Sequence, residues 1–260
     1  MAATGDTENF CKPDGPRYEG SYAGGSARFS GELSVVSWNI KFAREIDTAI
    51  AELNETDQLR NADIMLLQEM DDEGVDAIAR SLGLNYVYFP ASVHCRTGKK
   101  FGNAVLARWE ISGSAKLLLP HESPRTGERR IAARAHVAVD GRDVVAYSVH
   151  TETFALSARK RYEQFRSLVD DIAGEDQGYV LVGGDFNTIK AKNIKKLEER
   201  FRQVGLRRVS AGAGPTLKAG FMSFTFDHIF VRGMAGIDNR VWKDTAASDH
   251  FPVWQRLLLQ

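Results

Sequence analysis

The chain has 260 residues, enough to bury a substantial hydrophobic core within one domain. Hydrophobic residues make up 43% and charged residues 26% of it, which is the composition of an ordinary soluble globular protein. Because 34 Lys and Arg residues balance 34 Asp and Glu residues, the net charge is zero, which argues against a globally basic surface that holds nucleic acid by counterion release alone. A local basic patch is still compatible with this balance.

The first 31 residues are rich in Gly, Ser, Pro and charged residues, and we expect them to form an arm over the surface of a single domain at 32–260. The start of the chain lacks the basic and apolar regions of a signal peptide, and no stretch approaches the roughly 20 apolar residues of a membrane helix. A chain whose leader had been removed would look the same, so cytoplasmic and extracytoplasmic locations both stay open. Two free thiols at Cys11 and Cys95 are favoured over a single disulfide.

Short apolar runs predict buried strands, and amphipathic stretches with apolar residues at helical spacing predict helices. In chain order we expect a strand at Leu33–Trp38, a helix at Glu45–Leu59, a strand at Ile64–Leu67, a helix at Asp72–Leu82, consecutive strands over 102–149 that end with Val144–Val149, a helix at Ser157–Ala173, a strand at Tyr179–Val182, a helix at Lys190–Phe201, and strands at Ile229–Val231 and Phe251–Trp254. Strands outnumber helices, which favours an α/β sandwich of two mixed sheets with helices outside.

Polar residues stand at the ends of these apolar runs. Those that directly follow a predicted strand are Asn39, Glu69, His150, Asp185 and Asn187. Those that stand just before a predicted strand are Asp227, Asp249 and His250. If the last strands run antiparallel to the first group, all of these side chains gather on one rim of the sandwich. Such a rim would be a cleft with acids, amides and two histidines.

Each of these residues also has an ordinary structural explanation. Asp185 and Asn187 could shape a turn or cap the following helix, and Glu69 could be a solvated loop acid. A single His150 or His250 is more often a hydrogen-bonded structural histidine than a catalyst. The functional interpretation therefore rests on the whole set, because so many polar residues at strand ends are hard to explain as separate structural accidents.

The residue types suit metal-assisted phosphoester hydrolysis. Oxygen ligands such as Glu69, Asp185, Asp249 and the amides of Asn39 and Asn187 favour Mg²⁺ or Mn²⁺ over zinc, for which Cys and His would be expected. Hydrolysis of a phosphodiester needs a deprotonated water, a cation on the non-bridging oxygens and help for the leaving group. A carboxylate–imidazole pair can hold a proton donor or acceptor in one tautomer, and the candidate pair is Asp227 with His250.

At these residues the sequence resembles the endonuclease/exonuclease/phosphatase superfamily, whose members share the DNase I-like fold. The matching motifs occur in the family's order between residues 33 and 254: Ser-Trp-Asn39, Leu-Gln-Glu69, Ser-Val-His150-Thr, Gly-Asp185-Phe-Asn187, Phe-Asp227-His-Ile-Phe and Ser-Asp249-His250. Any one motif is weak, but six in order are specific. The resemblance implies a four-layer αββα sandwich in which residues 32–260 form the catalytic domain.

The resemblance also implies roles for these residues. Glu69 would be the principal metal carboxylate, with Asn39 beside it and Asp249 as a further ligand. Asp185 and Asn187 would position the nucleophile and the phosphate, and His150 would contact phosphate oxygens. His250 would act as acid/base or stabilise the transition state, oriented by Asp227. Two further residues are expected at the substrate side, Asn103 in support of the site and Arg130 facing the substrate or forming a surface ion pair. His228, where relatives often carry Tyr or Arg, either tunes the pocket or is merely tolerated.

The resemblance implies a phosphate ester as substrate, and the fold restricts the chemistry more than the identity of that ester. Basic clusters at Arg96–Lys100, Arg125–Arg130 and Lys190–Lys196 would suit nucleic acid if they flank the cleft, and otherwise are ordinary solvated charge. No hydrophobic hairpin stands out that would favour a membrane lipid. We expect a monomeric phosphodiesterase with nuclease-like activity; the alternatives are a phospholipid or inositol phosphate phosphoesterase, and a silent relative that binds phosphorylated ligands as an adaptor.

Overall fold

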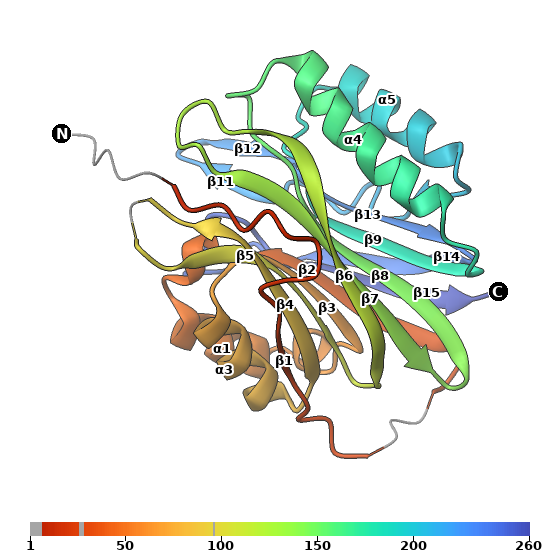
Figure 1. Ribbon diagram of the computed structural model, residues 1–260. Coiled ribbons are helices and arrows are strands. Elements are labelled where there is room, and N and C mark those ends of the chain that lie inside the picture. Colours follow the sequence, from red (N-terminus) through yellow and green to blue (C-terminus); the bar gives the residue numbers. More distant parts are fainter. Residues whose placement is uncertain (1–6, 26–28, 96) are drawn as a thin grey trace.

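The computed structural model describes residues 7–25, 29–95 and 97–260, and its elements form four layers (Figure 1). Two mixed sheets pack face to face, and helices cover the outer face of each, which confirms the predicted αββα sandwich. The seven strands of the first sheet, in spatial order, are β1 (Tyr18–Gly20), β4 (Asn85–Val93), β5 (Lys100–Ala107), β3 (Ile64–Met70), β2 (Glu32–Asn39), β15 (Val253–Leu259) and β14 (Met234–Val241).

The second sheet has six strands. In spatial order they are β10 (Arg207–Arg208), β13 (Asp227–Arg232), β9 (Tyr179–Asp185), β8 (Arg142–His150), β7 (Arg129–Val139) and β6 (Ile111–Glu122). A separate hairpin consists of β11 (Leu217–Ala219) and β12 (Met222–Phe224). The helices are α1 (Ile46–Glu55), α2 (Asp57–Arg60), α3 (Asp72–Leu82), α4 (Ala158–Ala173) and α5 (Ala191–Arg202), with a short 3₁₀ turn at Lys41–Ala43. Of the helices within the described ranges, none has the length and apolar character needed to cross a membrane.

Three apolar clusters hold the layers together. One lies between the two sheets and contains inward-facing residues of both, such as Leu66 and Leu181. The second joins the first sheet to α1 and α3 through residues such as Trp38, and the third joins the second sheet to α4 and α5 around Phe186 and Phe201. Each of these strands has helices on one face of its sheet and the other sheet on the opposite face, so both faces are buried. The sequences of such strands are therefore continuous apolar runs rather than alternating apolar and polar residues.

Several predicted elements differ from the observed ones in their bounds, and two of these differences have a clear local cause. The single helix expected at Glu45–Leu59 is two helices, because Thr56 adopts an extended conformation and its carbonyl accepts hydrogen bonds from the Leu59 and Arg60 amides at the start of α2. The last strand begins at Val253 rather than Phe251, because the intervening Pro252 has no N–H to donate to a sheet.

Strand directions bring the ends that carry the polar residues to one rim. The β2–β3 pair is parallel, and so is the β8–β9 pair, so each pair ends at the same edge of its sheet. The β13 strand runs antiparallel to β9 and β15 runs antiparallel to β2, so both begin where their neighbours end. In the second sheet His150 pairs with Asp185 and Asp185 pairs with Asp227, which places three of the expected site residues side by side.

The N-terminal segment takes part in this architecture. Residues 18–20 form β1, which pairs antiparallel with β4 at the edge of the first sheet. Nearer the start of the chain, the ammonium of the buried Lys116 on β6 donates to the carbonyls of Phe10 and Gly15 at 2.8 Å, and to that of Pro90 at 3.3 Å. One side chain thus ties the segment to both sheets.

Replacing Lys116 with Met should loosen the segment at residues 7–17. The variant keeps the apolar length of the side chain but leaves three carbonyls without their charged donor, which should cost about 2 kcal/mol of unfolding free energy. Urea unfolding measures the loss, and limited proteolysis should cleave the segment faster. The same substitution at the exposed Lys12 is the control, and equal stability of the two variants would contradict the tethering role.

Candidate active site at the rim shared by the two sheets

Asn39 joins the two sheets at the centre of the rim. Its Nδ2 donates to Glu69 Oε1 at 3.0 Å and to Asp185 Oδ2 at 3.2 Å, while its Oδ1 accepts from the Lys41 amide at 3.1 Å. Asn39 is wholly buried at the end of β2, where the parallel β3 brings Glu69 alongside it. Two carboxylates, one from each sheet, are therefore held on either side of a single amide.

Two of the rim residues occupy left-handed backbone conformations that side chains rarely adopt. Glu69 has φ 58° at an irregularity in the pairing of β3 with β5, and Asn187 has φ 46° just after β9. Asn187 is fixed there by hydrogen bonds from its amide nitrogen to Asp185 Oδ1 and from its Nδ2 to the Thr151 carbonyl, at 2.8 and 2.9 Å. Such strain costs of order 1–3 kcal/mol per residue and persists where surrounding structure over-determines it, often at functional sites.

A buried carboxylate–imidazole pair lies on the other side of Asp185. His250 Nδ1 is 2.9 Å from Asp227 Oδ2, which also accepts from Thr216 Oγ1 at 2.6 Å. His250 Nε2 is 3.7 Å from Asp185 Oδ2, so the imidazole bridges two acids. Because Asp227 binds Nδ1 of His250, the other ring nitrogen, Nε2, is directed at the rim. An imidazole held in this way can act as an acid or a base.

The electrostatics separate the two histidines. Burial alone would lower the pKa of His250, but the carboxylates of Asp227 and Asp185 outweigh it and raise the pKa to about 10. Burial, with the positive charges of Arg130 and His250, holds the pKa of His150 well below its ordinary value. His250 is therefore a cation at neutral pH and His150 is neutral. Burial also raises the pKa of Asp185 to about 7, although His250 opposes the rise.

Arg130 supplies positive charge from β7. Its Nε donates to Glu152 Oε2 at 3.1 Å, its guanidinium carbon lies 5.0 Å from the Phe101 ring centroid, and its Nη1 is buried without a hydrogen-bond partner. Its charge lowers the pKa values of both Glu69 and His150, which places the guanidinium near them. Arg130 is thus a buried cation beside the rim, and its pair with Glu152 is not a surface ion pair.

Two other expected site residues have different surroundings. Asn103 is buried on β5, and its Nδ2 donates to the Ile131 and Ser148 carbonyls at 3.1 and 2.9 Å, so its amide links the two sheets. Asp249 is 40% exposed in its side chain and forms an ion pair with Lys41 at 3.1 Å. The carboxylate of Asp249 nevertheless raises the pKa of Glu69, which means that it lies within electrostatic reach of the rim.

Three supporting residues were not predicted from the sequence. Glu152 holds Arg130, Thr216 holds Asp227, and Lys41 pairs with Asp249. Glu152 follows His150 by two positions, so its place after a buried strand was a usable signal. Thr216 lies in a Gly-rich loop far from its partner, and no local pattern marks it.

His228 does not face the rim. Its side chain is wholly buried on the helix side of the second sheet, with its ring centroid 6.0 Å from that of Phe186 and 6.2 Å from that of Phe230. Its Nδ1 lies 3.4 Å from Arg208 Nη1, and its Nε2 has no hydrogen-bond partner. Neighbouring residues of a strand face opposite sides of the sheet, so Asp227 reaches the site and His228 does not. It therefore does not tune the pocket.

The sequence-based expectation that no hydrophobic hairpin is present was wrong. The β11–β12 hairpin carries Phe221 at its tip, where 97% of that residue is exposed, and Met222 beside it is also exposed. Leu217 forms a bridge with His250, and the Lys218 amide donates to the Asp249 carbonyl at 3.1 Å. The short strands hid the hairpin in the sequence, but these backbone contacts attach it to the edge of the candidate site.

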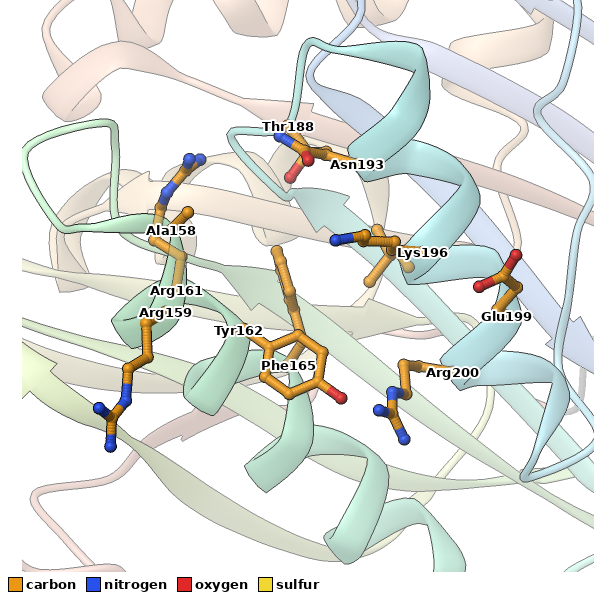
Figure 2. A pocket seen from close by; sticks show the side chains of 11 residues that line it. Ala158, Arg159, Arg161, Tyr162, Phe165, Thr188, Asn193, Lys196, Glu199 and Arg200 are labelled. Atoms are coloured by element: carbon orange, nitrogen blue, oxygen red, sulfur yellow. The ribbon is translucent and has the colours of Figure 1, made fainter.

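A basic cavity of about 510 Å³ lies between α4 and α5 (Figure 2). Its walls include Arg159, Lys196 and Arg200 together with the aromatic ring of Tyr162. Arg161 in the same wall donates through Nη1 to the Asn187 carbonyl at 3.0 Å, so the cavity adjoins the back of the rim. Part of the basic cluster at Lys190–Lys196 thus borders a cavity.

The other two basic clusters are largely neutralised by nearby acids. Lys99 and Lys100 pair with Asp71 and Asp72, each at 2.7 Å, and Arg96 lies outside the described residues. In the cluster at Arg125–Arg130, Arg129 pairs with Glu122 at 2.8 Å. Cys11 and Cys95 are free thiols.

Comparison with known proteins relates this architecture to one family. A model of the Endonuclease/Exonuclease/phosphatase family matches residues 36–250. A UPF0294 protein of Vibrio cholerae is 25% identical over 237 residues, which cover 88% of this chain and 79% of that protein. An endonuclease/exonuclease/phosphatase structure from Beutenbergia cavernae is 22% identical with a TM-score of 0.69, over 88% of this chain and 72% of that one. D. rerio TDP2 complexed with a single strand DNA product is 16% identical with a TM-score of 0.66, over 87% and 98%.

The burial of His228 should make the protein sensitive to acid. Burial lowers the pKa of His228 to about 3, whereas its unfolded value is about 6.5. Between these values the unfolded chain binds the extra proton, so wild-type stability should fall as the pH falls, by up to about 1.4 kcal/mol per pH unit. The unfolding free energy of a His228→Phe variant should depend less steeply on pH between 6 and 4. Parallel curves for the two proteins would contradict this assignment.

Proposed function

Because the chain belongs to the endonuclease/exonuclease/phosphatase family, we propose that it is a divalent-metal-dependent phosphodiesterase whose active site is the rim around Asn39. The supporting observation is the placement of two carboxylates, the partly buried Glu69 and the buried Asp185, on either side of the Asn39 amide. Burial raises the pKa of each carboxyl group, because neither anion is fully compensated by its neighbours. A divalent cation would supply the missing compensation.

The donor set fits a hard cation. Glu69 would be the principal ligand, with Asp249 and Asn39 beside it, and carboxylate and amide oxygens are the ligands that Mg²⁺ and Mn²⁺ prefer. Asn39 now directs its amide hydrogens at both carboxylates, so its oxygen would become available only when the amide turns and releases the Lys41 nitrogen. When bound, the cation would neutralise charge on the phosphate oxygens and acidify water.

The remaining rim residues would carry out the proton transfers and bind the phosphate. Asp185, oriented by the Asn187 amide, would accept the proton of the attacking water. His250, held by Asp227, would stabilise the developing negative charge and protonate the leaving oxygen through Nε2. The buried, unpartnered Nη1 of Arg130 is a donor suited to a phosphate oxygen.

The basic cavity supports a polyanionic substrate. Arg159, Lys196 and Arg200 lie in its walls beside the loop that follows Asn187, and an aromatic ring stands among them (Figure 2). Cationic side chains with aromatic neighbours are typical of sites for single-stranded nucleic acid. The D. rerio structure with a DNA product shares only the fold with this chain, and it makes single-stranded DNA a reasonable first substrate to assay.

The purified full chain should hydrolyse bis(p-nitrophenyl) phosphate in Mg²⁺ or Mn²⁺, and EDTA should abolish turnover. Glu69→Gln should lower the rate by about 100-fold or more, because the cation contributes several kcal/mol to stabilisation of the transition state. Asp72→Asn, which removes an equal charge outside the rim, should retain activity. Metal binding without turnover on a panel of phosphodiesters, nucleic acids and lipids would favour the silent adaptor instead.

The exposed hairpin supports a second candidate substrate, a phospholipid. Phe221→Ser should lower the hydrolysis of a phospholipid presented in vesicles, by about tenfold, without changing the hydrolysis of soluble bis(p-nitrophenyl) phosphate, because an exposed aromatic residue would act only on an apolar surface. Ile237→Ser, which alters another exposed apolar residue on β14, is the control. An unchanged vesicle rate, or an equal loss on both substrates, would exclude this role of the hairpin.

A further inference from the structure

A second group of metal-ligand side chains lies outside the rim described above. His94 and Cys95 belong to the loop between β4 and β5, and Glu128 belongs to the loop between β6 and β7. One potential ligand atom from each lies within 4.8 Å of the others. His94 and Glu128 are only 4% and 2% exposed, while Cys95 is partly exposed, so the group is open to solvent on the side of the thiol.

The spacing of the His94 and Glu128 ligand atoms is compatible with a shared metal ion. His94 Nε2 is 3.7 Å from Glu128 Oε1, which is beyond hydrogen-bonding distance. Two ligands that each lie roughly 2.1 Å from a tetrahedral zinc ion are about 3.4 Å apart. A contraction of a few tenths of an ångström would therefore bring the imidazole and the carboxylate to ligand positions, and rotation of the Cys95 side chain would bring in the thiolate.

Both loops hold their ligands in place without help from a metal. The first is closed by hydrogen bonds between His94 and Lys99 and between Gly98 and His94, and the second by two bonds between Ser123 and the residues Gly127 and Glu128. Each loop turns through a glycine in the left-handed region, with φ of 66° and 71°. The ligand positions are therefore set by backbone geometry, which reduces the entropy lost on binding.

Neighbouring side chains orient the ligands. The His94 ring lies 4.4 Å from that of Phe42, centroid to centroid. Its Nδ1 lies 3.2 Å from Thr97 Oγ1 and accepts a hydrogen bond from the Thr97 amide at 3.3 Å, and its Nε2 lies on the side of Glu128. The Glu128 carboxylate accepts from Thr126 Oγ1 at 3.0 Å and from the Cys95 amide at 3.3 Å. Such outer hydrogen bonds are what fix the orientation of imidazole and carboxylate ligands in metal sites.

We propose that His94, Cys95 and Glu128 form a zinc site that is separate from the proposed catalytic metal site. A thiolate, an imidazole and a carboxylate are the ligands of zinc, whereas the rim around Glu69 offers oxygen ligands to a harder cation. Zn²⁺ binds through His94 Nε2, Cys95 Sγ and a Glu128 oxygen, with water in the fourth position. Binding releases the proton of the Cys95 thiol to solvent, and the imidazole proton moves from Nε2 to Nδ1, where Thr97 Oγ1 accepts it.

The zinc site braces the loops that border the rim. The Phe101 ring lies 5.7 Å from that of His94 and 5.9 Å from that of His150, and Phe42 follows Lys41, the partner of Asp249. A cation that joins the two loops fixes the position of His94, and through it the aromatic side chains that pack behind the rim.

Cobalt substitution tests the site without reference to turnover. Co²⁺ added to the reduced, EDTA-treated full chain should produce the near-ultraviolet absorption of a thiolate-to-cobalt bond, and Zn²⁺ should displace it. Cys95→Ser should remove this absorption and weaken Zn²⁺ binding at least tenfold. Cys95 is the partly exposed ligand, so this conservative change should leave the fold intact, as circular dichroism can verify.

Two matched variants locate the signal. Cys11→Ser removes the other thiol, and Glu69→Gln removes the main ligand of the proposed catalytic metal, and both should retain the full absorption. Absence of the band in the wild-type chain, or its persistence in Cys95→Ser, would overturn the proposal. Loss of the band in Cys11→Ser would show that the thiolate belongs to Cys11 rather than to Cys95, and this result would also overturn the proposal. None of these outcomes depends on whether the protein hydrolyses a phosphodiester.

Discussion

The hydrogen bond between His250 Nδ1 and Asp227 Oδ2 holds the imidazolium among the acids of the rim and offsets part of their negative charge. Three acids, Glu69, Asp185 and Asp227, lie close together at the rim, and buried unpaired carboxylates would be costly. His250 stays protonated because Asp227 and Asp185 together outweigh the cost of burying its charge. The imidazolium in turn lowers the pKa values of Asp185 and Glu69, so the negative charges depend on it. Removing His250 would leave Asp227 and Asp185 without their shared cation.

This charge arrangement is possible because of strand direction and close packing. Parallel pairs end at the rim, and antiparallel neighbours begin there, so the strand ends themselves place these side chains together. At Gly184 the β8 backbone comes so close that an added Cβ would lie 1.9 Å from the Val149 carbonyl oxygen, which sets Asp185 beside His150. The left-handed conformations of Glu69 and Asn187 add strain at the same place, and the apolar clusters on both sides of each sheet sustain it.

Much of this arrangement could be predicted from the sequence, because buried strands read as apolar runs and polar residues stand out at their ends. Asn39 and Asp185 were recognisable in this way, and the order of the motifs predicted the sandwich. What escaped prediction depends on contacts between distant segments. Thr216 reaches Asp227 from a Gly-rich loop, and strands of three residues are too short to reveal the hairpin that exposes Phe221. The orientation of His228 follows from strand alternation, which motif matching ignores.

The central claim is that Asp227 and His250 act as one catalytic unit in metal-dependent phosphodiester hydrolysis. A double-mutant cycle on kcat/KM with bis(p-nitrophenyl) phosphate tests it most directly, with Asp227→Asn, His250→Ala and the double variant compared in Mg²⁺. The account predicts that His250→Ala lowers the rate by about two to four orders of magnitude, and that adding Asp227→Asn to it costs less than about threefold more. Losses that multiply in the double variant, or a loss below tenfold for His250→Ala, would contradict it.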